Sequence, residues 1–149
     1  MRAVLQRVES GYVSINNIKT GCIEKGIVVL VGFNADDDET AFNYIIDKIT
    51  NLRIFGDENG KMNLSVKDIN AGLLIIPNFT LYSDARKGRR PNFSLGASPE
   101  KAEKMFDKFI DMLRKNFENV QTGVFKADMK VFLINDGPVT ILLDSDRNF

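Results

Sequence analysis

Two apolar runs near the end of the chain, residues 131–134 and 139–143, are joined by only four residues, N-D-G-P. Both runs have the length and composition of β-strands. Pro138 fixes its own φ and lacks a backbone N–H, and Gly137 reaches backbone angles that other residues avoid. The joint is therefore a sharp corner that exposes backbone carbonyls, and an X-Pro bond in such a corner is the usual place for a cis peptide. Local sequence alone favours an ordinary hairpin turn, and a rigid carbonyl-bearing surface is the alternative.

The remaining patterns predict strands with hairpin-length connections and two helices. Strands are predicted over residues 1–14, 18–23, 26–33, 72–82, 120–125 and 129–134, with a further short one starting within 51–55. One helix is predicted over 39–51, and a second begins at Ser98, an N-cap followed by Pro99 and Glu100. This order favours an α+β single domain over residues 1–149, with a mixed, largely antiparallel, curled or barrel-like sheet and two outer helices. The chain has no strand–Gly-rich loop–helix unit, which argues against a doubly wound nucleotide fold.

Side chains that could suggest a cofactor or a metal have simpler structural roles. The apolar positions of both helices recur at helical spacing and predict core faces: Phe42, Ile45, Ile46 and Ile49 in the first, and Ala102, Met105, Phe106, Phe109, Ile110 and Leu113 in the second. The acidic run 36–38 lacks the spacing of a calcium loop and is predicted to cap the first helix. Asp144 and Asp146 are expected at the surface, and Cys22 is expected to be a small buried hydrophobe.

The composition argues against several functional classes. The chain has no histidine, which removes Ser-His and Cys-His triads and histidine metal sites. The 20 basic and 20 acidic residues cancel, which argues against a protein that coats nucleic acid nonspecifically. No apolar run reaches the ~18 residues of a membrane span, and the first residues alternate like a strand rather than a signal peptide. A single cysteine excludes an internal disulfide, so we expect a protein of the reducing cytoplasm.

A second segment with chemical potential is P-N-F-T, residues 77–80. Pro77 cannot donate to a sheet ladder, so the strand must end, bulge or lie at an edge there. The amides of Asn78, Phe79 and Thr80 are then free to point into a cleft, where successive N–H groups can form an oxyanion hole. Thr80 has no evident base to activate it as a nucleophile. The plain alternative, which local sequence favours, is an edge strand with a bulge and a solvent-facing hydroxyl.

The polar loop over residues 83–97 carries four basic residues within five positions: Arg86, Lys87, Arg89 and Arg90. Phe93 follows them. Arginine and lysine contact phosphates and aromatic rings stack on bases, so the loop is a candidate contact for nucleic acid. A short basic run is also typical of a solvated or ion-paired loop.

In their order along the chain, these segments resemble the D-aminoacyl-tRNA deacylase family, also called D-tyrosyl-tRNA deacylases. M-R-A-V-L-Q-R-V opens the chain, F-T-L-Y-S-D-A-R-K-G-R-R-P-N-F lies in its middle, and N-D-G-P-V-T stands near its end. The resemblance covers essentially the whole chain, and the order and spacing of the pieces make it specific. It implies a homodimeric hydrolase, without cofactor or metal, that cleaves the ester between a D-amino acid, or mischarged glycine, and the terminal adenosine of tRNA.

The resemblance also implies which residues bind the substrate. Gly137-Pro138, in cis, would reach from one subunit into the partner's pocket at the dimer interface. Its carbonyls would hold the substrate amino group so that an L side chain meets the wall. Arg7 would support this loop, and Met129 would lie near the adenosine. Lys87 and Arg90 match the family's basic loop and are predicted to contact the tRNA acceptor end.

The implied catalytic segment departs from the family pattern at two positions. The family motif is Ser-Gln-x-Thr, and here Pro77 and Asn78 replace its first two residues. Phe79 falls at the variable position and Thr80 matches. The resemblance implies that the amides near Phe79 and Thr80 stabilise the oxyanion, together with the 2′-hydroxyl of the substrate, and that Thr80 positions rather than attacks. Asn78, Phe79 and Thr80 are thus the predicted catalytic residues.

Two other functions remain open on the sequence. One is a noncatalytic module that binds the aminoacyl-tRNA acceptor end, with hydrolysis disabled by Pro77 and Asn78. The other is a structural dimer with no role in RNA metabolism.

Overall fold

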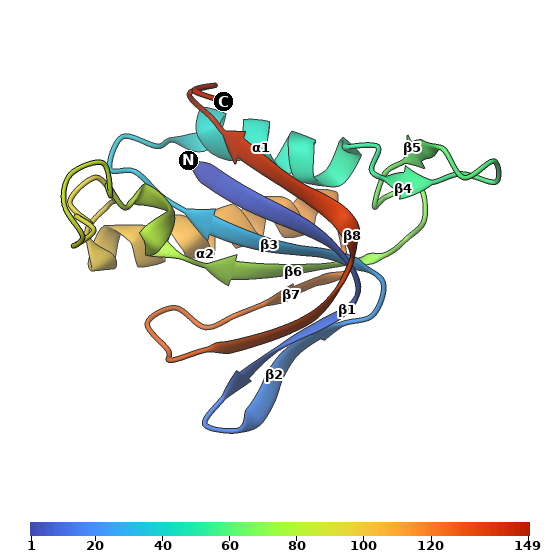
Figure 1. Ribbon diagram of the computed structural model, residues 1–149, viewed down its shortest axis with the longest axis horizontal. Coiled ribbons are helices and arrows are strands. Elements are labelled where there is room, and N and C mark those ends of the chain that lie inside the picture. Colours follow the sequence, from blue (N-terminus) through green and yellow to red (C-terminus); the bar gives the residue numbers. More distant parts are fainter.

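The computed structural model covers residues 1–149 and contains a six-stranded sheet, a separate two-stranded ribbon and two α-helices (Figure 1). The elements follow in the order β1 (Arg2–Ile15), β2 (Ile18–Ile23), β3 (Gly26–Gly32), α1 (Glu39–Asn51), β4 (Phe55–Gly56), β5 (Met62–Leu64), β6 (Gly72–Pro77), the 3₁₀ turn η1 (Phe79–Tyr82), α2 (Pro99–Asn116), β7 (Val120–Thr122) and β8 (Lys130–Asp144). The fold class predicted from the sequence, α+β with a mixed, barrel-like sheet and two outer helices, is confirmed.

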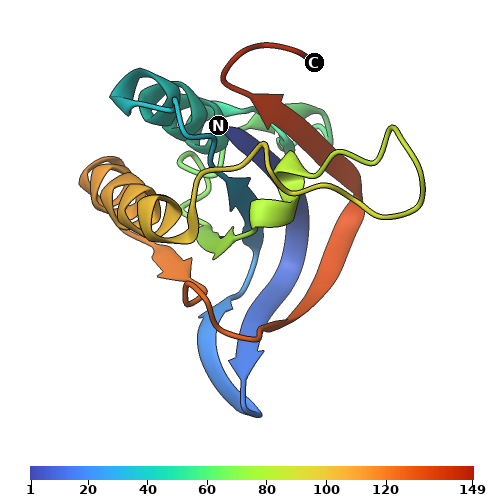
Figure 2. The ribbon, with the colours of Figure 1, turned by 90° about the vertical axis from the view of Figure 1, so that its left-hand side faces the viewer.

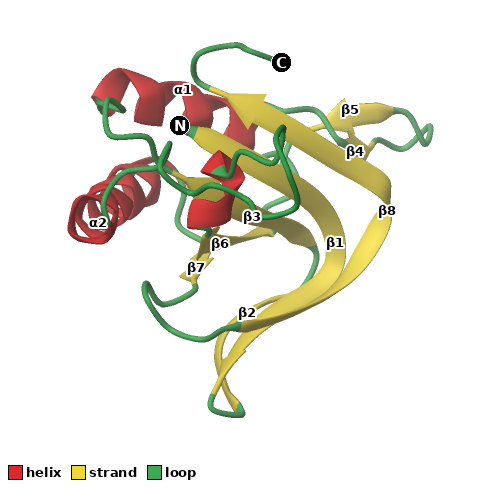
Figure 3. Ribbon diagram, turned by 60° about the vertical axis from the view of Figure 1, so that its left-hand side comes forward, coloured by secondary structure: helices red, strands yellow, loops and turns green.

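The sheet is built around β1. The first half of β1 pairs antiparallel with β3 and the second half with β2, while β8 pairs antiparallel along nearly its whole length. Two parallel ladders, β3–β6 and β6–β7, complete the order β2-β1-β3-β6-β7. The long strands β1 and β8 twist and bend together. The sheet therefore curls into an open barrel, with α1 and α2 packed on its outer side (Figure 2, Figure 3).

The N-D-G-P corner is not a hairpin turn, because β8 runs through it as one strand. Residues before and after the corner both pair with β1, and the register shifts on either side of Val8. Residues 136–139 therefore bulge from the ladder without ending it. The Gly137-Pro138 bond in this bulge is cis. Gly137 and Pro138 of this bulge are exposed.

Alternate side chains of the central strands serve two different layers. Ile27 and Val29 of β3 belong to the main core, which fills the space between the sheet and the helices. Val28, which lies between them, and Leu74 of β6 belong to a smaller cluster on the inside of the curl. The inner face of the sheet is therefore apolar but not covered by helices.

Both helices begin where the sequence predicts. Asp38 caps α1 by accepting hydrogen bonds from the amides of Thr40 and Ala41 at 2.9 and 3.2 Å. The bond from Ala41 is the main cause of the lowered pKa of Asp38. Pro99 opens α2, although the side chain of Ser98 makes no capping hydrogen bond. The acidic run before α1 is therefore structural, as expected.

Apart from the N-D-G-P corner, the predicted strand bounds are wrong by more than one residue in three places. The strand expected over 72–82 ends at Pro77, because proline interrupts the ladder and the chain turns into η1. The strand expected over 120–125 stops at Thr122. Residue 51 still belongs to α1, so the next strand, β4, begins only at the end of the predicted range 51–55.

The sequence prediction was wrong about the exposure of two side chains. Cys22 is exposed, because its neighbour Ile23 takes the inward position on β2. Asp144 is only 1% exposed. It accepts hydrogen bonds from Arg2 and Asn148, so its charge is compensated inside the protein. Asp146 is exposed, as expected.

Candidate active site

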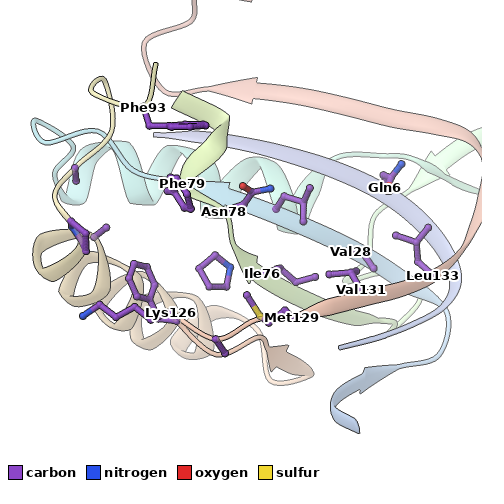
Figure 4. A pocket seen from close by; sticks show the side chains of 17 residues that line it. Gln6, Val28, Ile76, Asn78, Phe79, Phe93, Lys126, Met129, Val131 and Leu133 are labelled. Atoms are coloured by element: carbon purple, nitrogen blue, oxygen red, sulfur yellow. The ribbon is translucent and has the colours of Figure 1, made fainter. Parts of the chain in front are cut away.

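A cavity of about 770 Å³ lies on the inner side of the curled sheet (Figure 4). Of its 17 lining residues 12 are hydrophobic. They come from β3, β6, η1, the loop before α2, α2 itself, the connection between β7 and β8, and β8. Gln6 and Leu133 lie at one end, Phe93 and Lys126 at the other, and Asn78 between them. An apolar cavity of this size with few polar groups is typical of a small-molecule site.

Proline ends β6 at the edge of this cavity. Pro77 is the last residue in the ladder and opposes Val31 of β3. The amide of Asn78 then donates to the carbonyl oxygen of Val31 at 2.7 Å, and the chain turns into η1. The expectation that the strand ends, bulges or lies at an edge at Pro77 is therefore confirmed.

The amides after Pro77 are not all free. The amide of Asn78 is used by Val31, and the amide of Thr80 donates to the side-chain oxygen of Asn78 at 3.1 Å. The prediction of free amides is thus wrong for Asn78 and Thr80, because the asparagine side chain caps the turn that follows it. Of the three amides, that of Phe79 remains the candidate donor to a bound oxyanion.

The hydroxyl of Thr80 also belongs to this cap. Its Oγ1 lies 2.6 Å from Oδ1 of Asn78, to which it donates. Thr80 is exposed and does not line the cavity. No basic side chain accepts its proton, so the geometry gives this hydroxyl a role in shaping the turn rather than in attack.

The connection between β7 and β8 forms the opposite wall. The backbone φ of Lys126 in this connection is 62°, a value that residues other than glycine and asparagine seldom adopt. Its Nζ forms a 2.7 Å ion pair with Glu103 of α2, and this hydrogen bond raises the pKa of Lys126. Met129 lines the cavity close to Gly123, where an added Cβ would lie 2.7 Å from the methionine sulfur.

The Gly137-Pro138 bulge does not line the cavity of its own chain. Both residues are exposed on β8. Arg7 supports the bulge: its Nε lies 3.0 Å from the carbonyl oxygen of Asp136 and 3.0 Å from the Oδ2 of that residue. A terminal nitrogen of Arg7 also donates to the carbonyl oxygen of Ile54 at 2.5 Å. Arg7 therefore fixes the bulge and does not face the cavity.

The basic loop lies exposed between η1 and α2. Reciprocal backbone hydrogen bonds between Asp84 and Asn92 close its base. Arg86 donates two hydrogen bonds to Asp84 at 2.8 and 2.7 Å and holds the pKa of that carboxyl well below its usual range. The three remaining basic residues of the loop form no ion pair: Lys87, Arg89 and Arg90.

Comparison with known proteins gives the family. The model of the family described as D-Tyr-tRNA(Tyr) deacylase matches residues 4–144. The chain belongs to this deacylase family. A relative from Natranaerobius thermophilus, named D-aminoacyl-tRNA deacylase, is 53% identical over 150 residues that cover 100% of both chains. A relative of the same name from Thermotoga petrophila is 49% identical over 149 residues, again covering 100% of both.

Two solved structures share the fold of this chain. The chain is similar to the c-Myc DNA Unwinding Element Binding Protein, with a TM-score of 0.93 and 38% identity over 97% of this chain and 98% of the other. It is also similar to a probable eukaryotic D-amino acid tRNA deacylase, with a TM-score of 0.81 over 95% and 97% of the chains, where 17% identity shows a common fold alone. The resemblance drawn from the motifs is thus confirmed, and the chain is a member of a family of ester hydrolases. None of its helices is long and apolar enough to cross a membrane.

The structure brings together only part of the residues that the deacylase motifs single out. Asn78, Phe79 and Met129 line one cavity. The other motif residues lie outside it: Thr80, Arg7, Gly137, Pro138, Lys87 and Arg90.

Sequence reasoning missed several lining residues. Gln6 and Lys126 face the cavity, and so do Val28 and Leu30. Alternate side chains of β3 point to opposite faces of the sheet. All of these side chains are apolar, however, so the sequence does not indicate which face lines a cavity and which faces the helices.

Proposed function

We propose that the protein hydrolyses the ester that joins a D-amino acid, or mischarged glycine, to the terminal adenosine of tRNA. The observation that carries this proposal is the meeting of the apolar cavity with the proline-ended strand β6, where Asn78 and Phe79 enter the lining. Cavities of this size accept ligands as large as a nucleoside. The aminoacyl group and the adenosine would share the cavity, with Met129 beside the adenosine.

The chemical step needs little from the side chains. Water attacks the carbonyl carbon of the ester, the carbonyl oxygen becomes an oxyanion, and the bond to the ribose oxygen then breaks as that oxygen takes up a proton. The Phe79 amide would donate to the oxyanion, and losing one such donor typically costs about 10²–10³ in rate. Asn78 and Thr80 would hold the turn in place. Because the chain has no histidine, the 2′-hydroxyl of the substrate would serve the proton transfer.

Chiral selection would come from a second copy of the chain. In the proposed homodimer, the exposed Gly137-Pro138 bulge enters the cavity of the partner, and its carbonyls hold the substrate amino group so that an L side chain meets the wall. Glycine has no side chain to exclude and would pass. The position of β8 supports the dimer, because it is an edge strand that pairs only with β1 and exposes Phe132, Ile134 and Leu142 by 45–57%.

Recognition of the tRNA would be confined to its acceptor end. Lys87 and Arg90 would contact phosphates there, since both are exposed and free of ion pairs. The net charge of zero suits such a limited contact. The proposal places the protein in the cytoplasm, where its substrate would be found.

The test is deacylation of matched D-tyrosyl-, L-tyrosyl- and glycyl-tRNA by the purified protein. Loss of the D and glycyl esters with the L ester spared is the expected result. Loss of all three would show a cavity without chiral selection. Hydrolysis of none, with binding of the charged tRNA retained, would favour the noncatalytic acceptor-end module.

A further inference from the structure

Two aromatic rings stand exposed at one end of the cavity. Phe79 is 62% exposed and Phe93 47% exposed. Their centroids are 5.5 Å apart with an interplanar angle of 66°, an edge-to-face pair built from η1 and the loop before α2. Both rings line the cavity and lie at the end opposite Gln6 (Figure 4). Contiguous apolar surface that stays in water marks an interaction site more often than it serves stability.

The position of Phe93 is fixed without a ligand. It follows Asn92, which exchanges backbone hydrogen bonds of 2.7 and 2.9 Å with Asp84 at the base of the basic loop. The side chain of Asn92 accepts a further hydrogen bond from the amide of Ser94 at 2.9 Å. Because the backbone on both sides of Phe93 is held, ordering this ring on binding costs little entropy.

The loop that leads into Phe93 carries free positive charge. Arg86 is neutralised by Asp84, but the next basic residues on the same closed loop have no acidic partner: Lys87, Arg89 and Arg90. Aromatic rings flanked by unpaired cations form the usual site for single-stranded nucleic acid, in which bases stack on the rings and phosphates bind the cations. Bases inside a duplex cannot offer their faces to such a pair.

We infer that Phe79 and Phe93 form a stacking site for the unpaired nucleotides that precede the terminal adenosine of tRNA. The inference rests on the proposed function, in which the aminoacyl group and the terminal adenosine share the cavity. The RNA strand then leaves the cavity over the aromatic pair, and the phosphates of these nucleotides bind Lys87, Arg89 and Arg90. Stacking is tolerant of sequence, so the contact senses an unpaired 3′ end rather than a particular base.

The experiment measures the Kd of the full-length protein for uncharged RNA. One probe is a labelled RNA hairpin that carries the unpaired 3′ end of tRNA, and the other is the same hairpin with a blunt end. The variants are Phe93→Ala, Phe93→Trp and the control Leu95→Ala. Leu95 is a matched control because it lies on the same loop and is also 47% exposed.

Phe93→Ala should weaken binding of the overhang hairpin on the order of tenfold or more. Phe93→Trp should restore it, because the larger ring still stacks, and Leu95→Ala should bind like the unchanged protein. Salt separates the two kinds of contact. Phe93→Ala should leave the slope of log Kd against log salt unchanged, whereas Arg89→Ala should reduce it by about 0.7, the value for one phosphate of a single strand.

Three results would overturn the inference. The first is that Phe93→Ala binds the overhang hairpin no worse than Leu95→Ala does. The others are that Phe93→Ala weakens binding of the blunt hairpin by the same factor, or that Phe93→Trp binds the overhang hairpin as weakly as Phe93→Ala. The readout is independent of hydrolysis. A protein that binds the overhang through Phe93 but cleaves no ester would contradict the proposed function alone. A protein that cleaves D-aminoacyl esters while Phe93→Ala binds normally would contradict this inference alone.

Discussion

The guanidinium of Arg2 lies over the ring of Tyr82, with its Cζ 4.6 Å from the ring centroid. The same side chain donates to the carbonyl oxygen of Leu81 at 3.1 Å and to Asp144 at 3.3 Å. Tyr82 is 3% exposed, and burial raises the pKa of its hydroxyl, which has no hydrogen-bond partner. Arg2 therefore ties the end of η1 to the first and last strands of the sheet.

Arg2→Ala should lower kcat for deacylation on the order of 10- to 100-fold, because a small displacement of η1 misplaces the Phe79 amide. KM should change much less. Arg2→Lys should recover part of the activity, since lysine keeps the cation over the ring. The control is Arg53→Ala, which removes a 2.8 Å bond from an arginine to the carbonyl oxygen of Asn63 on the β4–β5 ribbon. An Arg2→Ala protein that is less stable but keeps its kcat would reduce Arg2 to a packing residue.

Asp144 should make stability depend on pH in the acid range. Burial raises the pKa of Asp144, but hydrogen bonds from Asn148, the amide of Asp146 and Arg2 outweigh it, and the net pKa is lowered. A lowered folded pKa means that the carboxylate stabilises the fold above its unfolded pKa of about 3.9, and that this contribution disappears as the pH falls through the folded value.

Asp144→Asn should therefore lower the free energy of unfolding by about 1–2 kcal/mol at neutral pH. The difference from the unchanged protein should stay constant down to about pH 5 and narrow below about pH 4. Urea titrations at a series of pH values measure it. Asp146→Asn, at an exposed neighbour, should show no such difference. If the difference in the free energy of unfolding grows as the pH falls, the pKa of Asp144 is not lowered in the folded protein.

Local sequence rules predicted the elements well and the long-range pairings poorly. The apolar spacing of α1 and α2 and the Pro99 start follow from neighbouring residues alone, and both were correct. The N-D-G-P corner was misassigned because the deciding fact is that both halves of β8 pair with β1, more than a hundred residues away in the chain. Asp144 was misplaced for the same reason, since its partner Arg2 is 142 residues distant.

The residues of the candidate site also divide into those that the sequence predicted and those that it did not. Motif order led to Asn78, Phe79 and Met129, which do meet in one cavity. The capping bonds from Thr80 to Asn78, which occupy an amide that the sequence suggested was free, depend on the side-chain geometry of a single turn. Gln6 was not predicted as a site residue, because the sequence of β1 does not indicate which face of the strand lines a cavity.

Thr80→Val should keep the rate of deacylation within about tenfold of the unchanged protein. In the structure its hydroxyl donates only to Asn78, so valine should cost less than about tenfold, the usual scale for one neutral hydrogen bond. Loss of a catalytic nucleophile would instead cost on the order of 10⁶. Single-turnover rates on D-tyrosyl-tRNA decide between them. Asn78→Ala, which removes the acceptor of both Thr80 bonds, should cost more than Thr80→Val, and the reverse order would restore a direct role for the hydroxyl.

Gly137→Ala should abolish deacylation while changing the free energy of unfolding by less than about 1 kcal/mol, as is usual for exposed sites. Gly137 is exposed, and the proposed dimer brings it against the substrate of the partner's cavity, where a methyl group would block close approach. Initial rates and urea titrations on the same preparation measure both effects. Gly56→Ala is the matched control, because a Cβ there meets nothing closer than 3.9 Å.

The loss of deacylation in Gly137→Ala has a second possible cause within the chain, and a second variant separates the two causes. A Cβ on Gly137 would lie 2.2 Å from Oδ1 of Asn135, so Gly137→Ala could act by displacing that side chain. Asn135→Ala takes the obstructing oxygen away. If the methyl acts on the substrate, the double variant Gly137→Ala, Asn135→Ala should remain inactive while Asn135→Ala alone retains activity. Recovery of activity in the double variant would mean that Gly137 serves only the shape of its own bulge, and the chiral wall would have to be sought elsewhere.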